Sequence, residues 1–405
     1  MPDIAWRRVF DVVLNPKPNS ALDEAIAARM REQAPLIWLL GKVQSGKTSI
    51  VRAITGAEEA EVGVAFKPCT RASRIYEFPE NLPVVRFLDT RGLGEVAYDP
   101  TEDLALVEGP AHVVVAVARA MDPQQEAILG VLREVRRRHP GWALVLVQTR
   151  LHDGYPDARD HPPYAELAAV PGLDDLRRAL ELQASQFRGL PGKGVLRAVA
   201  VDLTRPEDQF SDPIYGLDAL LDALDEACSE GRVTLMHDLA RAARGTRAAR
   251  VHPHLLGYAS AAGISDLVPV LGFVTVPTLQ GKMLHSIAAL YGVEWNRRTL
   301  KEFVASLGTG TALGIAVSFT ARQLMKLIPV YGQIAGAAAA GASSAAVTYA
   351  LGRAACYYLE QVRLGRRDPA GVASMYRGSL KKAYAELRRR GDGGLRSAMG
   401  KDAAP

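Results

Sequence analysis

The chain contains little cysteine and few aromatic residues. Its three cysteines, Cys69, Cys228 and Cys356, lie far apart along 405 residues, and no C-x-x-C pair occurs. This pattern excludes a disulfide framework and a cysteine-based zinc site, and it is typical of a reducing compartment. Residues 1–8 include no apolar run like the one at the centre of a secretory signal. We therefore expect a cytoplasmic protein.

A strong excess of one charge is also absent from the chain as a whole. The net charge is +5, with 23% charged and 48% hydrophobic residues, which is typical of a globular protein of two or three domains. The exception is the segment 361–405, with 11 Lys or Arg and 4 Asp or Glu. We interpret it as a solvated tail or as a segment that contacts an anionic membrane surface or an acidic partner. No aromatic or RNP-like pattern accompanies it, so nucleic acid is the weaker candidate.

A glycine-rich segment between an apolar run and a helical pattern carries the strongest chemical signal. Residues 36–40 are apolar, residues 41–48 read Gly-Lys-Val-Gln-Ser-Gly-Lys-Thr, and residues 49–54 have helical spacing. This arrangement predicts a P-loop, in which backbone N–H groups and a helix N-terminus surround phosphates. The lysine is expected to contact the β- and γ-phosphates, and the threonine to bind Mg²⁺. The predicted nucleotide contacts are Gly41, Gln44, Ser45, Gly46, Lys47, Thr48 and Ser49.

A nucleotide switch also needs a second acidic group near Mg²⁺ and a sensor of the γ-phosphate. Asp89 follows the apolar strand pattern 84–88 and is predicted to act on Mg²⁺ through bound water. Gly92 is predicted to offer its N–H to the γ-phosphate. Thr70, in the polar segment 57–72, is predicted to close on both the Mg²⁺ and the γ-phosphate.

Strand and helix patterns alternate from residue 35 to residue 230. The alternation predicts an α/β domain with a mainly parallel sheet. Asp122 and Pro123 have the residue types that begin a helix, so we expect a helix start there. The expected strands are 36–40, 73–78, 84–88, 112–118, 143–148 and 195–203, and the expected helices are 47–55, 124–138, 174–187 and 216–230.

The rest of the chain is predicted to be helical. The first helices are expected to pack on the domain that follows them, and the last domain is expected to be an all-α bundle rich in Ala and Gly. The expected divisions are 1–34 (helical segment), 35–230 (P-loop domain), 231–250 (basic linker helix), 251–362 (hydrophobic helical domain) and 363–405 (basic tail).

Three uncharged runs lie in the helical domain, at 268–281, 303–321 and 327–352. The two longer runs have the length of a membrane span, but their Ala, Gly, Ser and Thr content makes them only weakly apolar. A soluble or amphitropic bundle and a membrane-embedded domain both remain open.

The order of P-loop, switch threonine, Asp-Thr-x-Gly and strand-end base motif resembles the Era-like GTPases of the translation-factor class. The resemblance rests on Leu39-Leu40-Gly41-Lys42, Pro68-Cys69-Thr70 and Leu88-Asp89-Thr90, which look closest to bacterial members. In some members a hydrophobic helical domain of unknown function follows the G domain, and segments 266–269, 291–292 and 328–332 are similar to it. The resemblance implies a Ras-like P-loop G domain followed by an all-α domain, with GTP or GDP and Mg²⁺ as ligands.

The base-reading motif departs from the Asn-Lys-x-Asp of that family. The chain reads Thr149-Arg150-Leu151-His152-Asp153 after an apolar strand. The resemblance implies that Thr149 and Arg150 replace Asn and Lys, and that Asp153 supplies the carboxylate one residue late. His152 cannot accept two N–H bonds from guanine, so GTP is expected while ATP or relaxed specificity stays open. The loop 201–206 is the expected base-side loop.

Two further positions bear on hydrolysis. Leu93 stands where Ras-type enzymes have the glutamine that orients water, and leucine cannot do so by hydrogen bonding. Hydrolysis then needs an Arg in trans, a bound K⁺ or the partner in a nucleotide-dependent homodimer. Gln44 stands where K⁺-dependent relatives have Asn, which weighs against K⁺. Arg91, in place of the usual Pro, is either a charge-stabilising group or an exposed side chain.

These residues together predict a Mg²⁺-dependent GTP-binding protein and slow GTPase. It is expected to act as a nucleotide switch for its helical domain, in the cytoplasm, with the inner face of the cell membrane as a candidate place of action. The first alternative is a membrane-acting or scaffold protein in which the nucleotide is structural and hydrolysis negligible. A P-loop kinase is the second, although no lid pattern with arginines is present.

Overall fold

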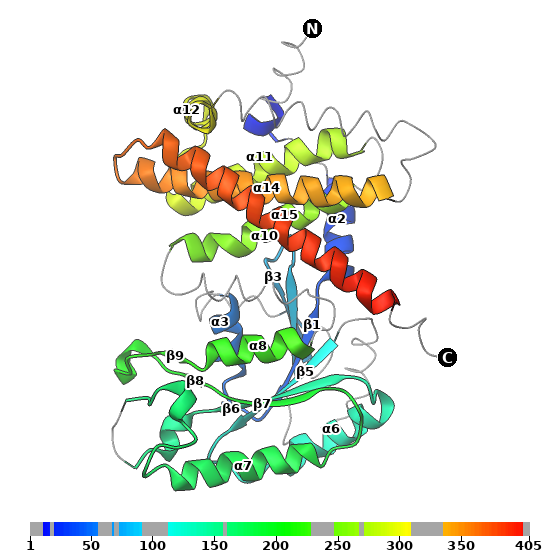
Figure 1. Ribbon diagram of the computed structural model, residues 1–405, viewed down its shortest axis with the longest axis vertical. Helices are drawn as coiled ribbons and strands as arrows, with labels where there is room; N and C mark the ends of the chain where they lie inside the picture. Colours follow the sequence, from blue (N-terminus) through cyan, green and yellow to red (C-terminus); the bar gives the residue numbers. More distant parts are fainter. Residues whose placement is uncertain are drawn as a thin grey trace. The chain divides into compact units, whose positions relative to one another are not determined.

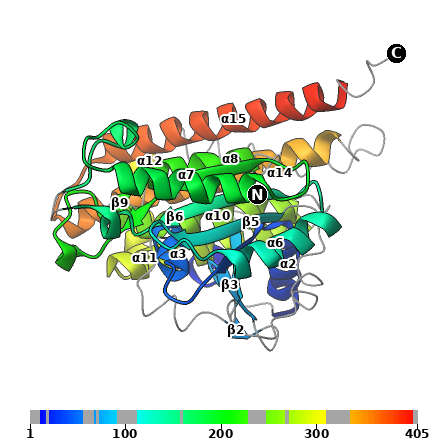
Figure 2. The same cartoon turned by 90° about the horizontal axis from the view of Figure 1, so that it is seen from below.

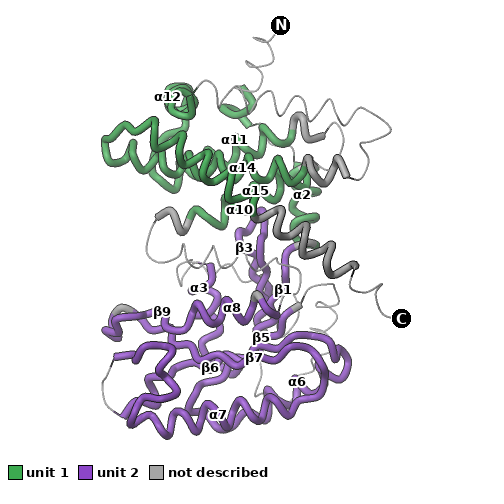
Figure 3. The backbone as a smooth tube through the Cα atoms, viewed as in Figure 1, with its two compact units in different colours: residues 1–33, 251–405 green, residues 34–250 purple. Residues whose placement is uncertain are grey.

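The computed structural model describes the chain in two compact units, coloured separately in Figure 3. One unit is residues 34–250, and the other is residues 1–33 together with 251–405. The described residues are 11–16, 20–55, 67–68, 73–90, 112–156, 160–227, 247–266, 271–308 and 335–399.

The first unit is built on a seven-stranded sheet with the order β2-β3-β4-β1-β5-β6-β7 (Figure 1). The strands β4, β1, β5, β6 and β7 run parallel to one another, whereas β3 is antiparallel to β4 and β2 is antiparallel to β3. The mainly parallel sheet predicted from the sequence is confirmed. Its strands are β1 (Leu36–Gly41), β2 (Lys67–Pro68), β3 (Ser73–Phe78), β4 (Val85–Thr90), β5 (His112–Arg119), β6 (Ala143–Thr149) and β7 (Leu196–Ala200).

Helices cover the sheet. Figure 1 shows β6 and β7 passing between α7 and α8, which both contact these strands. Trp38 of β1 packs in one core with Leu132 of α6 and with Phe187 of α7. A central strand that is apolar throughout is typical of a sheet buried on both faces. The helices are α3 (Lys47–Thr55), α6 (Glu126–Arg138), α7 (Asp174–Arg188) and α8 (Leu217–Ala227).

The expected start of α6 is wrong by two to three residues. The helix begins at Glu126, and its N-cap residue Gln125 makes no side-chain cap bond. The predicted cap, Asp122, instead accepts hydrogen bonds from the Gln124 N–H at 3.0 Å and from Lys42 Nζ at 2.8 Å. A carboxylate engaged in this way closes a turn before the helix.

The expected strand 195–203 is also divided in two. β7 ends at Ala200, and residues Asp202–Leu203 form β8, which pairs antiparallel with β9 (Ile214–Tyr215). The strand is divided because residues 202–203 pair with β9 and not with β6: Asp202 lies opposite Tyr215. The chain therefore leaves the main sheet after Ala200 and enters a separate hairpin.

The second unit is helical, as predicted. The helices α14 and α15 run side by side in Figures 1 and 2, and α11 packs on α14. Small residues bring helices together: a Cβ added to Gly263 of α10 would lie 3.0 Å from the carbonyl oxygen of Gly341 in α14. The helices are α2 (Ser20–Gln33), α10 (Arg247–Asp266), α11 (Leu271–Tyr291), α12 (Arg297–Leu307), α14 (Ala335–Arg363) and α15 (Pro369–Met399).

The N-terminal segment differs from expectation, because it belongs to the helical unit and not to the domain that follows it. Lys282 Nζ in α11 lies 2.6 Å from an Asp23 carboxylate oxygen in α2. His285 Nε2 donates to the carbonyl oxygen of Leu14 at 2.9 Å. An ion pair across 259 residues of sequence and a hydrogen bond across 271 residues hold the N-terminal segment against α11.

None of the helices in the described ranges combines the length and the apolarity needed for a membrane span. Parts of all three uncharged runs, residues 268–270, 309–321 and 327–334, lie outside those ranges.

Candidate functional site

The loop between β1 and α3 has the backbone geometry of a phosphate-binding turn. Gln44 has φ of 59° and Gly46 has φ of 100°, both in the left-handed region. Gly41 is required by space, because an added Cβ would lie 2.6 Å from both Ser45 Oγ and the Val117 carbonyl oxygen. Left-handed backbone at two nearby positions of a short loop turns several backbone N–H groups toward one point. Loops of this kind bind anions through those N–H groups.

Lys47 is the first residue of α3, and its side chain reaches back to this loop. Its Nζ donates to the carbonyl oxygens of Gly41 at 2.7 Å and Lys42 at 3.1 Å, and it lies 3.8 Å from Asp89 Oδ1. Asp89 is on β4, directly beside Leu39 of β1. The side chain of Lys47 is only 12% exposed. The structure therefore brings two predicted site residues together at the carboxyl ends of adjacent strands, where nucleotide sites form in such sheets.

Thr48 and Ser49 occupy the first turn of α3. The Thr48 side chain is exposed, and no acidic side chain lies in this turn. The positive end of the helix is thus left to an external anion. Hydroxyl and carboxylate oxygens, as in Thr48 and Asp89, are the ligands that Mg²⁺ prefers. The loop lies between the first strand and the first helix of an α/β unit with a mainly parallel sheet.

The chemistry of the donor set fits Mg²⁺ held mainly by phosphate oxygens and water. Among the residues that the structure describes, no cluster of three His, Cys, Asp or Glu could hold a metal by itself. Thr70 and Gly92, predicted to contact Mg²⁺ and the γ-phosphate, lie outside the described residues, as do Arg91 and Leu93.

Thr149 joins the segment predicted to read the base to the loop between β1 and α3. Its Oγ1 donates to the Ser45 carbonyl oxygen at 2.7 Å and lies 3.3 Å from that of Ala118. The residue is 4% exposed. A Cβ added to Gly46 would lie 3.5 Å from Thr149 Cγ2. The end of β6 is therefore fixed against the loop that holds Lys47.

Arg150 and Asp153 lie together in the turn after β6. Arg150 has φ of 57°, and its Nε lies 3.2 Å from Asp153 Oδ2. A 3₁₀ turn, Leu151–Gly154, carries the aspartate, and buried Leu151 anchors it. The carboxylate remains 35% exposed, so its oxygens can accept further hydrogen bonds from a ligand.

Sequence reasoning missed two links that hold the outer side of the phosphate loop. Arg119 at the end of β5 donates through Nε to the Gln44 carbonyl oxygen at 3.2 Å and through Nη2 to Gln44 Oε1 at 3.3 Å. Lys42 pairs with Asp122 at 2.8 Å. Burial alone would raise the pKa of Asp122, but hydrogen bonds from Lys42 and Gln124 and the nearby cations hold it below its usual value.

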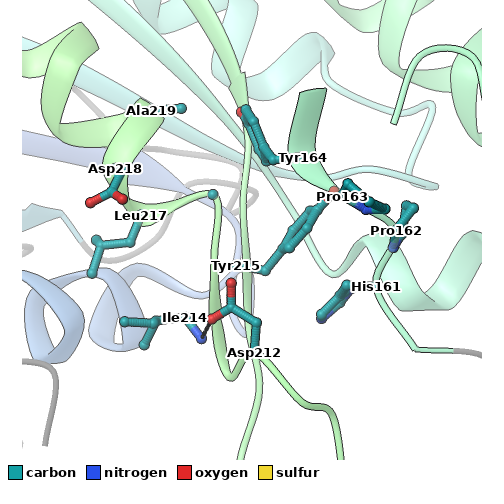
Figure 4. Close-up of a pocket in the computed structure, with 11 residues that line it drawn as sticks. His161, Pro162, Pro163, Tyr164, Asp212, Ile214, Tyr215, Leu217, Asp218 and Ala219 are labelled. Carbon is teal, nitrogen blue, oxygen red and sulfur yellow. Dashed lines mark hydrogen bonds between the residues drawn. The ribbon is translucent and has the colours of Figure 1, made fainter. Parts of the chain in front are cut away.

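A separate cavity of about 410 Å³ lies where the chain enters α8 (Figure 4). Pro163, Tyr164 and Leu217 are among its lining residues. His161 is stacked between Phe210 and Tyr215, with both ring centroids 4.4 Å away. Burial lowers the pKa of His161, although nearby aspartates oppose the change. None of the predicted site residues that the structure describes lines this cavity.

Among known proteins, only solved structures resemble this chain. No protein-family model and no curated protein matches the chain. Similar solved structures include Toc33 from Arabidopsis thaliana in complex with Mg²⁺ and GMPPNP, at 15% identity and a TM-score of 0.29, covering 51% of this chain and 91% of that one. The cytosolic domain of the T. maritima FeoB iron transporter in its GMPPNP form has 13% identity and a TM-score of 0.25, covering 82% and 99%.

A third similar structure is LeoA, a bacterial dynamin GTPase from ETEC, at 13% identity and a TM-score of 0.30, covering 94% of this chain and 75% of that one. All three TM-scores are below 0.5, so we base no functional conclusion on these likenesses. The Era-like resemblance stays a prediction.

Proposed function

We propose that the α/β unit binds GTP with Mg²⁺ and hydrolyses it slowly to GDP. One observation carries the proposal: the Lys47 ammonium is fixed by two carbonyl oxygens of the loop, 3.8 Å from Asp89. This loop also has left-handed backbone at Gln44 and Gly46. An ammonium and converging N–H groups at the start of a helix form a site for a polyphosphate.

The chemistry is attack of water on the γ-phosphoryl group, with GDP as the leaving group. Lys47 and the loop N–H groups neutralise the charge that spreads over the phosphate oxygens. Mg²⁺ would neutralise charge between the β- and γ-phosphates, held by Thr48 directly and by Asp89 through water. We assign Thr70 as a further Mg²⁺ contact and the Gly92 N–H as the sensor of the γ-phosphate. Ordering of segments 57–72 and 92–108 would pass the nucleotide state to the helical unit.

The purified protein is expected to hydrolyse GTP well below the usual median turnover of about 10 s⁻¹, because Leu93 cannot orient water. Phosphate release at saturating GTP, over a range of protein concentrations, measures this rate. A rate per protein that rises with concentration supports a homodimer that supplies the missing group. Fast turnover that is independent of concentration contradicts the assignment of Leu93.

The same purified protein also distinguishes a nucleotide switch from a scaffold in which the nucleotide is structural. A structural nucleotide stays bound through purification and is not turned over, whereas a switch exchanges GDP for added GTP. ATP titrated in parallel tests specificity.

We further propose that the helical unit associates with anionic membrane surfaces. The support is a set of exposed cationic side chains at the start of α15 and in the turn before it: Arg366, Arg367, Arg377, Lys381 and Lys382. Each Lys or Arg near an anionic surface contributes roughly 1 kcal/mol at low salt.

Reversing two of these charges, in Lys381→Glu/Lys382→Glu, is expected to weaken flotation with anionic liposomes by at least about tenfold. The matched control is Arg178→Glu/Arg188→Glu on α7, where both arginines already pair with acidic residues. The proposal is wrong if the full-length protein fails to float with anionic liposomes at low salt.

A further inference from the structure

A buried carboxylate holds the turn that follows β6. Asp202 Oδ2 accepts the His152 backbone N–H at 2.8 Å and lies 2.7 Å from His152 Nδ1. The Asp202 side chain is 1% exposed. Because a carboxylate oxygen accepts hydrogen bonds, Nδ1 is the donor in this contact. The imidazole ring is thereby fixed in its orientation.

The other side of the same imidazole faces the carboxylate predicted to read the base. His152 Nε2 lies 3.5 Å from Asp153 Oδ1, and Arg150 Nε lies 3.2 Å from Asp153 Oδ2. A continuous chain of polar groups therefore runs from Asp202 through His152 and Asp153 to Arg150. Each carboxylate oxygen of Asp153 thus lies near one polar nitrogen, Oδ1 near His152 Nε2 and Oδ2 near Arg150 Nε.

Both ends of this chain rest on rigid structure. Asp202 is in β8, opposite Tyr215 of β9, and the Tyr215 ring is itself stacked on His161. At the other end, the Thr149 hydroxyl bonds to the Ser45 carbonyl oxygen and fixes the start of the turn to the phosphate loop. A carboxylate held between such supports has little freedom to turn, which lowers the cost of ordering it on a ligand.

We propose that His152 and Asp202 are positioning residues that aim the Asp153 carboxylate at two N–H groups of a guanine base. This rests on the proposed function. Guanine presents its N1–H and its 2-amino group on one edge, and a carboxylate accepts both. Adenine lacks this pair of donors, and hypoxanthine lacks the amino group. The chain from Asp202 compensates for the position of the aspartate, one residue later than in the familiar motif.

The test is calorimetric titration of the full-length protein with GDP, IDP and ADP in the presence of Mg²⁺. Wild-type protein is expected to bind GDP at least about tenfold more tightly than IDP, because IDP leaves one carboxylate oxygen unpaired. Asp153→Asn should bring the GDP and IDP affinities within about twofold of each other.

Asp202→Asn and His152→Ala should each lower the GDP-to-IDP ratio by about threefold or more and leave ADP affinity within about twofold of wild type. Unchanged ADP affinity shows that the phosphate loop is intact in a variant that folds. Asp175→Asn, an exposed aspartate on α7 paired with Arg178, is the matched control and should change no ratio.

The outcomes separate the two claims. If wild-type protein binds none of the three nucleotides, the proposed function fails. If it binds them but Asp202→Asn and His152→Ala keep the wild-type GDP-to-IDP ratio, the positioning role is wrong. If Asp153→Asn also keeps that ratio, another group reads the base.

Discussion

Replacing Lys47 with alanine is expected to weaken binding of Mg²⁺–GTP by at least about 100-fold, since hydrogen bonds between two charged groups are the strong ones. Its Nζ is held by the carbonyl oxygens of Gly41 and Lys42 and is largely shielded from solvent. The variant therefore loses a cation that is already oriented before the ligand arrives. Isothermal titration calorimetry measures the change, and circular dichroism checks that the fold is retained.

Lys42→Ala is the matched control for that experiment. Lys42 is in the same loop, but its ammonium pairs with Asp122 at 2.8 Å. Its removal is expected to cost less than about tenfold, because only a partly exposed link on the outer side of the loop is lost. Equal losses in both variants would mean that charge near the loop matters and the placement of Lys47 does not. An unchanged affinity in Lys47→Ala would contradict the P-loop assignment.

The second large effect is expected in the helical unit, at low pH. His252 of α10 is 3% exposed, and neither ring nitrogen has a hydrogen-bond partner among the residues that the structure describes. Its ring meets Tyr349 of α14 edge to face at 5.7 Å. Burial, with a smaller contribution from the Arg353 charge, lowers the pKa of His252 from 6.5 to about 4. The folded protein therefore holds this imidazole neutral where the unfolded chain protonates it.

The sign of the change in unfolding free energy with pH follows from which state, folded or unfolded, binds the proton. Between pH 6.5 and about 4 the unfolded chain binds it and the folded chain does not, so the unfolding free energy falls as the pH falls. The full loss of unfolding free energy is about 3.5 kcal/mol below pH 4, at roughly 1.4 kcal/mol for each unit of pKa difference. Above pH 7 this contribution no longer varies with pH.

His252→Phe keeps an aromatic ring beside Tyr349 and removes the titration. Hydrogen exchange measured for peptides of α10 and α14 should show that the wild type loses protection between pH 6.5 and 4 relative to the variant. The two proteins should follow parallel curves above pH 7. Parallel curves over the whole range would show that His252 is protonated in the folded state or is accessible to water.

The sheet and the position of the turn between β1 and α3 could be predicted because their signals are local. Every residue of Ala143–Thr149 is buried, and a continuous apolar run such as 143–147 between turn residues is typical of a central parallel strand. The loop signal is equally local, since glycines, lysine and threonine stand at fixed spacing beside one strand and one helix.

The supports of the site could not be predicted, because their partners are distant in sequence. Lys42 and Asp122 are 80 residues apart, and His152 and Asp202 are 50 apart. Each side chain has an ordinary role in its own segment, and only the folded sheet brings the pairs together. The β8–β9 hairpin has strands of two residues, too short to show a period of two.

The central claim is that the α/β unit binds a guanine nucleoside triphosphate through the Lys47 loop. Titration of the purified wild-type protein with GTP, with and without Mg²⁺, tests it most directly, with ATP titrated in parallel. The expected result is one GTP per chain, bound more tightly with Mg²⁺ than without it and more tightly than ATP. Absence of heat and of any saturable binding for both triphosphates, in protein shown to be folded, would contradict the claim.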